Sequence, residues 1–426
     1  MFLITQGLVF TVEFDKLFIH KGDKIMIAKK PSFLLLFLLI SFGSITAVAF
    51  TPALLEIAGF FNVSAKTASL TITLFLVGYA VGQLLYGPLA NRFGRKIALY
   101  IGIGLEIIAS LLCVIAAPLH AFWLLVLARL FMALGASVGL KMSFTLVADA
   151  YTQEESRKII SHLMIAFAIT PALGVAIGGF LVEHFAWMST FYFMAVYGLA
   201  VLALTMRMSE TAKSLDHNAL KPSKIWAKYS ATLARIELPV AALLMGSATS
   251  FVYVFASLAP FIAMQTIGLN PAQYGLWNLL PVLGVIAGSQ LSAHLSQSIS
   301  PMKAIAMGIG VMLVGVLIMA AAFLSGVFMA LFLFLPLLII YIGLGFIYAN
   351  ASGIATSKIE DKSNASAMMS FINMGLTTLI VLALGFVHIS AVILLPLVYC
   401  ILVGGAGVFA LILKKSYCSE VNIKGD

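Results

Sequence analysis

The sequence predicts an all-α integral membrane protein with twelve transmembrane helices in two six-helix halves. Of its 426 residues, 62% are apolar and only 10% are charged, whereas soluble domains have roughly 45–50% and about 25%. The apolar residues form runs long enough to cross a bilayer, which takes about 20 residues per helix. A polar segment near the middle of the chain separates two apolar stretches of similar length. Large soluble domains are therefore excluded.

The second half shows the predicted spans most clearly. Residues 238–302, 304–357 and 363–413 contain no Asp, Glu, Lys or Arg, and turn-forming residues lie near the middle of each run. Each run is therefore expected to form two helices joined by a short turn. The predicted helices of the whole chain span 33–55, 67–89, 97–117, 122–147, 160–182, 187–206, 238–262, 273–295, 303–325, 327–355, 366–387 and 390–413.

The basic residues predict the orientation of these helices. Lys66 falls on one face of the bundle and Arg129 and Lys141 fall within helices, whereas the rest of the 25 Lys and Arg residues lie on the face that holds both termini. The positive-inside rule makes that face cytoplasmic in a multi-pass protein of the inner (plasma) membrane. The net charge of +9 then reflects topology and contact with lipid headgroups. Nucleic acid is not an expected partner, because no nucleic-acid-binding module is recognisable.

The polar segments divide the chain into five parts. The N-terminal extension lacks the charge order of a signal peptide and is expected to lack stable structure; translation could start at Met1 or Met26. The expected parts are a cytoplasmic extension (1–32), a first half (33–206), a cytoplasmic central loop (207–237), a second half (238–413) and a cytoplasmic tail (414–426).

An internal repeat supports the division into halves. The second and eighth predicted helices each contain a GxxxG spacing followed by Gln-Leu, within Gly78–Leu84 and Gly284–Leu291. Such spacing lets helices approach closely. Paired six-helix repeats with a site at their interface are typical of secondary transporters.

A loop between the second and third predicted helices carries a family resemblance. Residues 87–96 read GPLANRFGRK, which resembles the GxLaDRxGRrk loop of the major facilitator superfamily. The wider segment 51–96 resembles the Bcr/CflA-type exporters of bicyclomycin and chloramphenicol resistance. The resemblance continues at ARLFMALGAS around Arg129, at TPALGVAIGG over 170–179 and at YIGLGFIYANA over 341–351. It implies the major facilitator fold and secondary transport.

The same resemblance implies a gate at the cytoplasmic side. Asn91 stands where the family loop usually has Asp, and Ala148 precedes Asp149 where these exporters often have Arg. The loop arginines can bond helix-end carbonyls or acids when the cytoplasmic side is shut. The expected gate residues are Gly87, Asn91, Arg92, Gly94, Arg95 and Lys96.

Three charged residues are candidates for coupling. Arg129 lies about 10 Å into its helix, where a cation costs about 2.5–3.5 kcal/mol. It is either a structural cation bonded to carbonyls of a neighbouring helix or, by resemblance, a link between proton and substrate binding. Glu106, midway along the third helix, is the only acid deep in a predicted span and either carries protons or pairs with Arg129. Asp149 has a gating or coupling role by its family position, whereas Lys141 is expected to snorkel.

Two further groups of residues complete the predicted site. By resemblance, the fifth helix carries an antiporter signature that lets the halves rock, namely Pro171, Gly174, Gly178 and Gly179. A largely apolar substrate cavity with a few orienting contacts is expected to include Tyr79, Gln83, Tyr253 and Asn350.

The sequence favours transport over catalysis. No GxxxxGK[ST], HExxH or nucleophile triad is recognisable, and the three cysteines are too dispersed for a metal site, so no enzyme activity, cofactor or metal is expected. We expect a monomeric, proton-driven exporter of small apolar or amphipathic compounds. The alternatives are an uncoupled facilitator or importer of a small metabolite, and a transport-inactive membrane receptor or assembly subunit.

Overall fold

A computed structural model describes residues 17–19, 26–28, 30–212, 214–233, 236–356 and 362–423. Twelve helices in this part of the chain are long and apolar enough to cross a membrane, which confirms the predicted all-α fold with twelve spans. Some spans combine shorter elements, because a helix such as α5 continues into α6 after a brief irregularity.

The first half contains α1 (Phe33–Val48), η1 (Thr51–Ala53), α2 (Leu54–Phe60), α3 (Ala65–Phe93), α4 (Arg95–Ile115), α5 (Phe122–Ala136), α6 (Val138–Ala150), α7 (Gln153–Phe185) and α8 (Met188–Met206). The polar segment then forms α9 (Pro222–Leu233). The second half contains α10 (Glu237–Phe261), η2 (Ile262–Ile267), α11 (Pro271–Trp277), α12 (Leu279–Leu295), α13 (Pro301–Leu324), α14 (Ala330–Thr356), α15 (Lys362–Leu384) and α16 (Ala391–Ile423).

Several segments differ from the expected boundaries, among them α16, which continues to Ile423, and the two described next. Helix α7 begins at Gln153 rather than 160, because a capping box starts it: the Thr152 hydroxyl accepts from the Glu155 N–H at 3.3 Å, and the Glu155 carboxylate accepts from the Thr152 N–H at 2.9 Å. In the N-terminal extension, which was expected to lack structure, β1 (Leu17–Ile19) pairs antiparallel with β2 (Met26–Ala28). Both strands are short apolar triplets, a composition that favours pairing.

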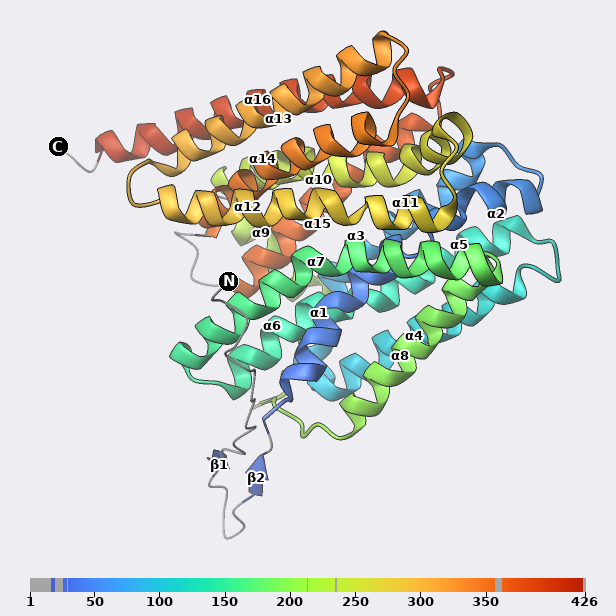
Figure 1. Cartoon of the computed structure of the whole chain (residues 1–426). Helices are drawn as coiled ribbons and strands as arrows, with labels where there is room; N and C mark the ends of the chain where they lie inside the picture. Colours follow the sequence, from blue (N-terminus) through green and yellow to red (C-terminus); the bar gives the residue numbers. More distant parts are fainter. Residues whose placement is uncertain are drawn as a thin grey trace, which may run out of the picture.

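Figure 1 shows the two halves side by side, with α1 to α8 on one side and α10 to α16 on the other. We call the end of the bundle with the α3–α4 and α12–α13 turns the terminal face, because the chain enters α1 and leaves α16 there. The end with α2 and the η2–α11 turn is the opposite face. The α9 helix lies at the terminal face (Figure 1).

The repeated GxxxG spacings have equivalent places in the two halves. A side-chain methyl at Gly78 would overlap the carbonyl of Leu130 in α5, and one at Gly288 would overlap the carbonyl of Ile342 in α14. The second span of each half thus packs backbone to backbone against the fourth. This close approach is what the small residues permit.

The halves meet at both faces. Helices α7 and α11 pack together toward the opposite face, and α3 packs along α15. The Ser69 hydroxyl of α3 donates to the Ser257 carbonyl of α10 at 3.3 Å, and the Tyr229 hydroxyl of α9 donates to the Leu84 carbonyl at 3.0 Å.

Candidate functional site

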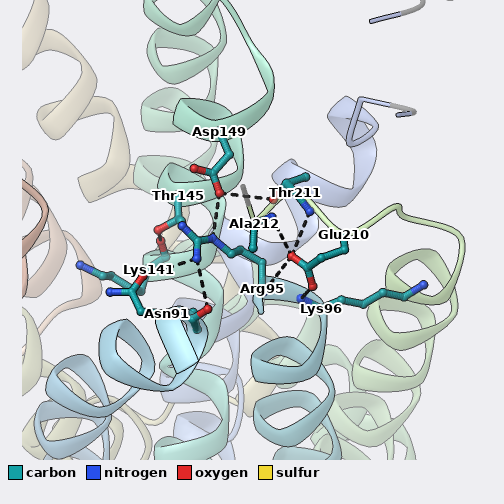
Figure 2. A network of polar contacts seen from close by, with 10 residues as sticks. Asn91, Arg95, Lys96, Lys141, Thr145, Asp149, Glu210, Thr211 and Ala212 are labelled. Carbon is teal, nitrogen blue, oxygen red and sulfur yellow. Dashed lines mark hydrogen bonds and ion pairs between the residues drawn. The ribbon is translucent and has the colours of Figure 1, made fainter. Parts of the chain in front are cut away.

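A polar network lies at the terminal face around the start of α4 (Figure 2). Gly94 has φ 97°, a conformation that glycine adopts readily, and the turn leaves the first N–H groups of α4 without helical partners. The Glu210 carboxylate accepts from the N–H groups of Arg95 and Lys96, each at 3.0 Å. A Cβ atom at Gly94 would lie 2.6 Å from the Glu210 carboxylate. Glycine is therefore required here both for its backbone conformation and for the space it leaves.

Glu210 is held ionised by this arrangement. Partial burial of the carboxylate acts to raise its pKa, but N–H donors from Ala212, Lys96, Arg95 and Thr211 together outweigh burial and hold the pKa below its usual range. Sequence reasoning missed Glu210. The feature of the sequence that could have indicated it is an acidic residue shortly after the sixth span.

Arg95 joins three helices within the same network. Its Nε lies 2.8 Å from the Asp149 carboxylate at the end of α6, and the two side chains are only 13% and 19% exposed. Its Nη1 donates to the Ala90 carbonyl of α3 at 3.1 Å and to the Asn91 amide oxygen at 3.4 Å. The Thr211 hydroxyl donates to Asp149 at 3.3 Å, as Figure 2 shows. Asp149 has no arginine next to it in the sequence, but the fold places Arg95 beside it.

The central segment is tied to the last turn of α3, which holds Asn91 and Arg92 and was expected to be part of a loop. The Asp216 N–H donates to the Asn91 carbonyl at 2.9 Å, and Arg92 donates to the His217 carbonyl. The Lys96 ammonium donates to the Met206 carbonyl at 3.0 Å. Gly87 lies beside Lys141, with 3.6 Å between its Cβ position and the Lys141 Cε.

The network reaches the second half through α9. Tyr229 of α9 bonds α3 and forms an apolar cluster with Ala365, Ala367 and Met368 of α15. The central segment therefore connects the α4 network to both halves at the terminal face.

Arg129 is completely buried in α5 and binds the backbone of α1 and α3. Its guanidinium donates to the carbonyls of Thr46 at 2.9 Å, Ala47 at 3.2 Å and Thr71 at 3.4 Å. The rings of Phe50 and Phe75 lie against it, with centroids 3.9 and 4.3 Å from Cζ. These contacts are those of a structural cation satisfied by carbonyls and aromatic faces.

Glu106 is also completely buried but faces other helices. One carboxylate oxygen accepts from the Ser110 hydroxyl at 2.9 Å, and the other has no hydrogen-bond partner among the residues that the structure describes. A Cβ at Gly198 of α8 would lie 2.6 Å from that second oxygen. Among the described residues Glu106 and Arg129 form no direct ion pair, because the Arg129 guanidinium is directed to α1 and α3 whereas the carboxylate is directed to α8; the two charges interact only at longer range.

The α7 glycines make tight contacts on two sides. A Cβ at Gly178 would overlap the Ala49 carbonyl in the first half, and one at Gly179 would overlap the Pro271 carbonyl of α11 in the second half. Gly174 packs less tightly, 3.4 Å from the Ile45 Cα. Pro171 lies within α7, one turn before Gly174. Adjacent residues of this helix thus touch both halves.

The expected cavity residues do not form one cluster. Tyr79 and Gln83 are buried on α3, where their side chains lie close together. Tyr253 of α10 lies within electrostatic reach of Tyr79 and Arg129. The Asn350 amide donates to the Ser292 hydroxyl at 2.9 Å, so it ties α14 to α12 within the second half.

Two tyrosines of α14 lie near Tyr253 of α10 and were not among the cavity residues expected from the sequence. Tyr341 and Tyr348 are partly accessible and lie near each other and near Tyr253. The Tyr348 hydroxyl lies 2.8 Å from the Thr249 hydroxyl of α10. Their spacing of seven residues, which places both on one face of a helix, is the signal that could have found them.

Comparisons with known proteins identify the family. The sequence profile of the Major Facilitator Superfamily matches residues 33–383. A solved structure, the D-xylose-proton symporter, superimposes with a TM-score of 0.72 over 89% of this chain and 96% of its own, at 15% identity. At that identity the likeness shows the fold alone.

Curated relatives carry transporter names. An uncharacterized transporter of Rickettsia bellii is 29% identical over 62% of this chain and 64% of its own length. The multidrug transporter MdfA of Yersinia pestis is 26% identical over 77% of this chain and 80% of its own length. The bicyclomycin resistance protein homolog of Haemophilus influenzae is 24% identical over 58% and 61%. The chain spans less than two thirds of the length of the Rickettsia relative.

Proposed function

The chain belongs to the major facilitator superfamily, and we propose that it is a proton-driven exporter of the Bcr/CflA type for small apolar or amphipathic compounds. The chain is a multi-pass membrane protein with the fold of small-molecule transporters. The finer proposal is supported by the sequence resemblance over residues 51–96 and by relatives named for multidrug transport and bicyclomycin resistance. The observation that carries proton coupling is the buried carboxylate oxygen of Glu106, for which the described part of the chain offers no hydrogen-bond partner.

Glu106 is the proposed proton carrier. A carboxylate buried in a membrane span is costly when it is charged and without a full set of partners. Protonation removes that cost, and the added O–H becomes a hydrogen-bond donor. Because Gly135 of α5 and Gly198 of α8 pack directly against Glu106, a change in its charge or hydration alters the packing of three spans of the first half.

The terminal-face network is the proposed gate. Glu210 and Asp149 hold the segment that leads to α9, and α9 contacts α3 and α15. Opening at this face requires α9 to leave one of these helices. Closing at the opposite face uses the tight packing of Gly179 against α11. Rocking of the halves between these two contacts provides alternating access.

The proposed orientation places the terminal face in the cytoplasm. The excess of Lys and Arg on that face follows the positive-inside rule. Both termini are then cytoplasmic in the inner membrane, and export carries substrate from the terminal face to the opposite face. We propose that the chain works as a monomer.

A second candidate is a proton-coupled importer of a small polar metabolite. The likeness in fold to a D-xylose-proton symporter favours it, as does the hydroxyl-rich group formed by Tyr253, Tyr341, Tyr348 and Thr249. An uncoupled facilitator or a transport-inactive subunit is suggested by Asn91 near the end of α3 and by the lack of Asp, Glu, Lys and Arg in residues 238–302, 304–357 and 363–413.

Flux of radiolabelled chloramphenicol into proteoliposomes separates these candidates. A proton antiporter accumulates the drug when the interior is acidic, because protons leave as the drug enters. A symporter accumulates its substrate when the exterior is acidic. Xylose uptake under the second gradient without chloramphenicol uptake under the first would replace the export proposal with import. Equal fluxes in protein-containing and empty liposomes under every gradient would favour the inactive subunit.

A further inference from the structure

A cavity of about 320 Å³ lies between the halves at the opposite face. One wall is the first turns of α3 in the first half, and the other walls come from α10, η2, α15 and α16 in the second half. The bond from Ser69 to the Ser257 carbonyl joins the two walls. The cavity is far from the α4 network, which lies at the terminal face.

The lining combines apolar surface with one cation. Leu70, Leu258, Phe261, Val381 and Leu384 contribute apolar side chains, and within the described part of the chain no acidic residue lines the cavity. The lining also contains hydroxyl and amide groups, which come from Ser69, Thr73, Gln265, Thr266 and Ser390. Small-molecule sites have this character, a mostly apolar wall with a few polar groups that fix orientation.

Of the described residues that line the cavity, Lys66 alone is an Asp, Glu, Lys or Arg residue. It is also the only Lys or Arg that the sequence places on the opposite face, where positive charge is otherwise absent. The partial charges at the helix ends around the cavity largely cancel, because the positive N-termini of α3 and α16 are offset by the negative C-termini of η2 and α15. The local field is therefore set mainly by Lys66.

The backbone next to the cavity is irregular. Pro260 lies within α10 and is followed by the π-helical turn of η2, which includes Gln265 and Thr266. Gly268 follows η2 as its C-cap, so η2 is a wide turn at the C-terminal end of the seventh span. The wide turn brings residues that an uninterrupted helix would place elsewhere into the lining.

We propose that this cavity binds a single-chain amphipathic carboxylate, with its anionic head on Lys66 and its chain along the apolar wall. The volume is near the lower end of the roughly 300–1,000 Å³ typical of small-molecule sites. It therefore suits one short chain and not the two chains of a phospholipid. Because the ligand touches both halves, it stabilises their present arrangement. The site does not depend on proton-driven export, since binding can occur without transport.

Equilibrium binding of octanoate to the protein in zwitterionic-lipid nanodiscs tests this site, with empty nanodiscs as the blank. Lys66→Gln should weaken binding about five- to tenfold, and Ala65→Phe, which places a ring in the cavity, should weaken it as well. Lys303→Gln is the matched control, because Lys303 also lies in the first turn of a serine-capped helix but at the terminal face. It should leave octanoate binding unchanged.

One comparison tests whether the site recognises the carboxylate head or only the alkyl chain. Another tests whether the ligand is a free amphiphile or a membrane lipid. Octanol and octyltrimethylammonium should bind more weakly than octanoate to the wild-type protein, and Lys66→Gln should remove that order. Equal affinity for octanoate and octanol, or unchanged octanoate affinity in Lys66→Gln, would overturn the proposal. Loss of octanoate binding in nanodiscs made of anionic phospholipid would assign Lys66 to lipid headgroups instead. A photoreactive octanoate should label η2 or the start of α3; labelling confined to the terminal face would contradict the assignment.

Discussion

Removal of the Arg95 guanidinium should release the terminal face. Arg95→Gln loses the 2.8 Å ion pair with Asp149 and the bond to the Ala90 carbonyl. Because both charged side chains are less than one fifth exposed, the charge-assisted bond is worth about 1.5–3 kcal/mol. With 1.4 kcal/mol per tenfold change, the open population of this face should rise roughly 10- to 100-fold.

The assay is the labelling rate of a cysteine beneath α9. Ala367 of α15 is 2% exposed and belongs to the cluster around Tyr229. Ala367→Cys, in a background without the native cysteines, should react with an impermeant maleimide roughly 10- to 100-fold faster when Arg95→Gln is present. Ala109→Cys in the first-half core should stay protected in both proteins, which separates gate opening from unfolding.

A surface ion pair provides the matched control. Lys158 and Glu154 are 3.3 Å apart, but their side chains are 74% and 83% exposed, so this pair contributes little. Lys158→Gln should leave the Ala367→Cys rate unchanged. If Arg95→Gln labels at the wild-type rate, the α4 network does not hold this face shut.

Three further predictions concern other contacts. The pKa of Glu210 is lowered, so its ionised carboxylate fully stabilises the segment around residues 210–217 above the ordinary Glu pKa of about 4.3. This stabilisation is lost as the pH falls through the lowered pKa. Hydrogen exchange of this segment should therefore be faster in Glu210→Gln than in wild type at neutral pH, and the difference should vanish in acid. Gly179→Ala should lower the free energy of unfolding by about 1–3 kcal/mol, because the added methyl overlaps α11, and it should also slow transport. At Gly104 a Cβ meets nothing within 4 Å, so Gly104→Ala should change neither the thermal unfolding nor the flux. Arg129→Lys keeps the charge but cannot reach all three carbonyls, so it should lower thermal stability by about 1–3 kcal/mol; an unchanged unfolding temperature would contradict its role in holding α1 and α3.

The spans could be predicted because hydrophobic runs and charge-free stretches depend only on local sequence. The bilayer requires the same length of apolar helix wherever a span lies, so no tertiary information was needed. Boundaries were less secure, as the capping box at Thr152 shows: it extends α7 by hydrogen bonds that hydrophobicity does not register.

The direction of side chains could not be predicted in the same way. Glu106 and Arg129 lie at similar depths on neighbouring spans, which suggested a pair, yet the rotation of each helix directs them to different neighbours. Glu210 lies in a polar segment, where acidic side chains are usually exposed to solvent. Its role depends on the N–H groups of α4, which come from more than 100 residues earlier in the chain.

Gradient-driven transport in a Glu106→Gln variant tests the central claim most directly. In proteoliposomes with an acidic interior, wild-type protein and Glu183→Gln, whose altered side chain is exposed at the opposite face, should accumulate labelled chloramphenicol above the outside concentration. Glu106→Gln should bring it only to equilibrium while still exchanging it across the membrane. Full accumulation by Glu106→Gln would show that the buried carboxylate is structural and that any proton coupling uses another group.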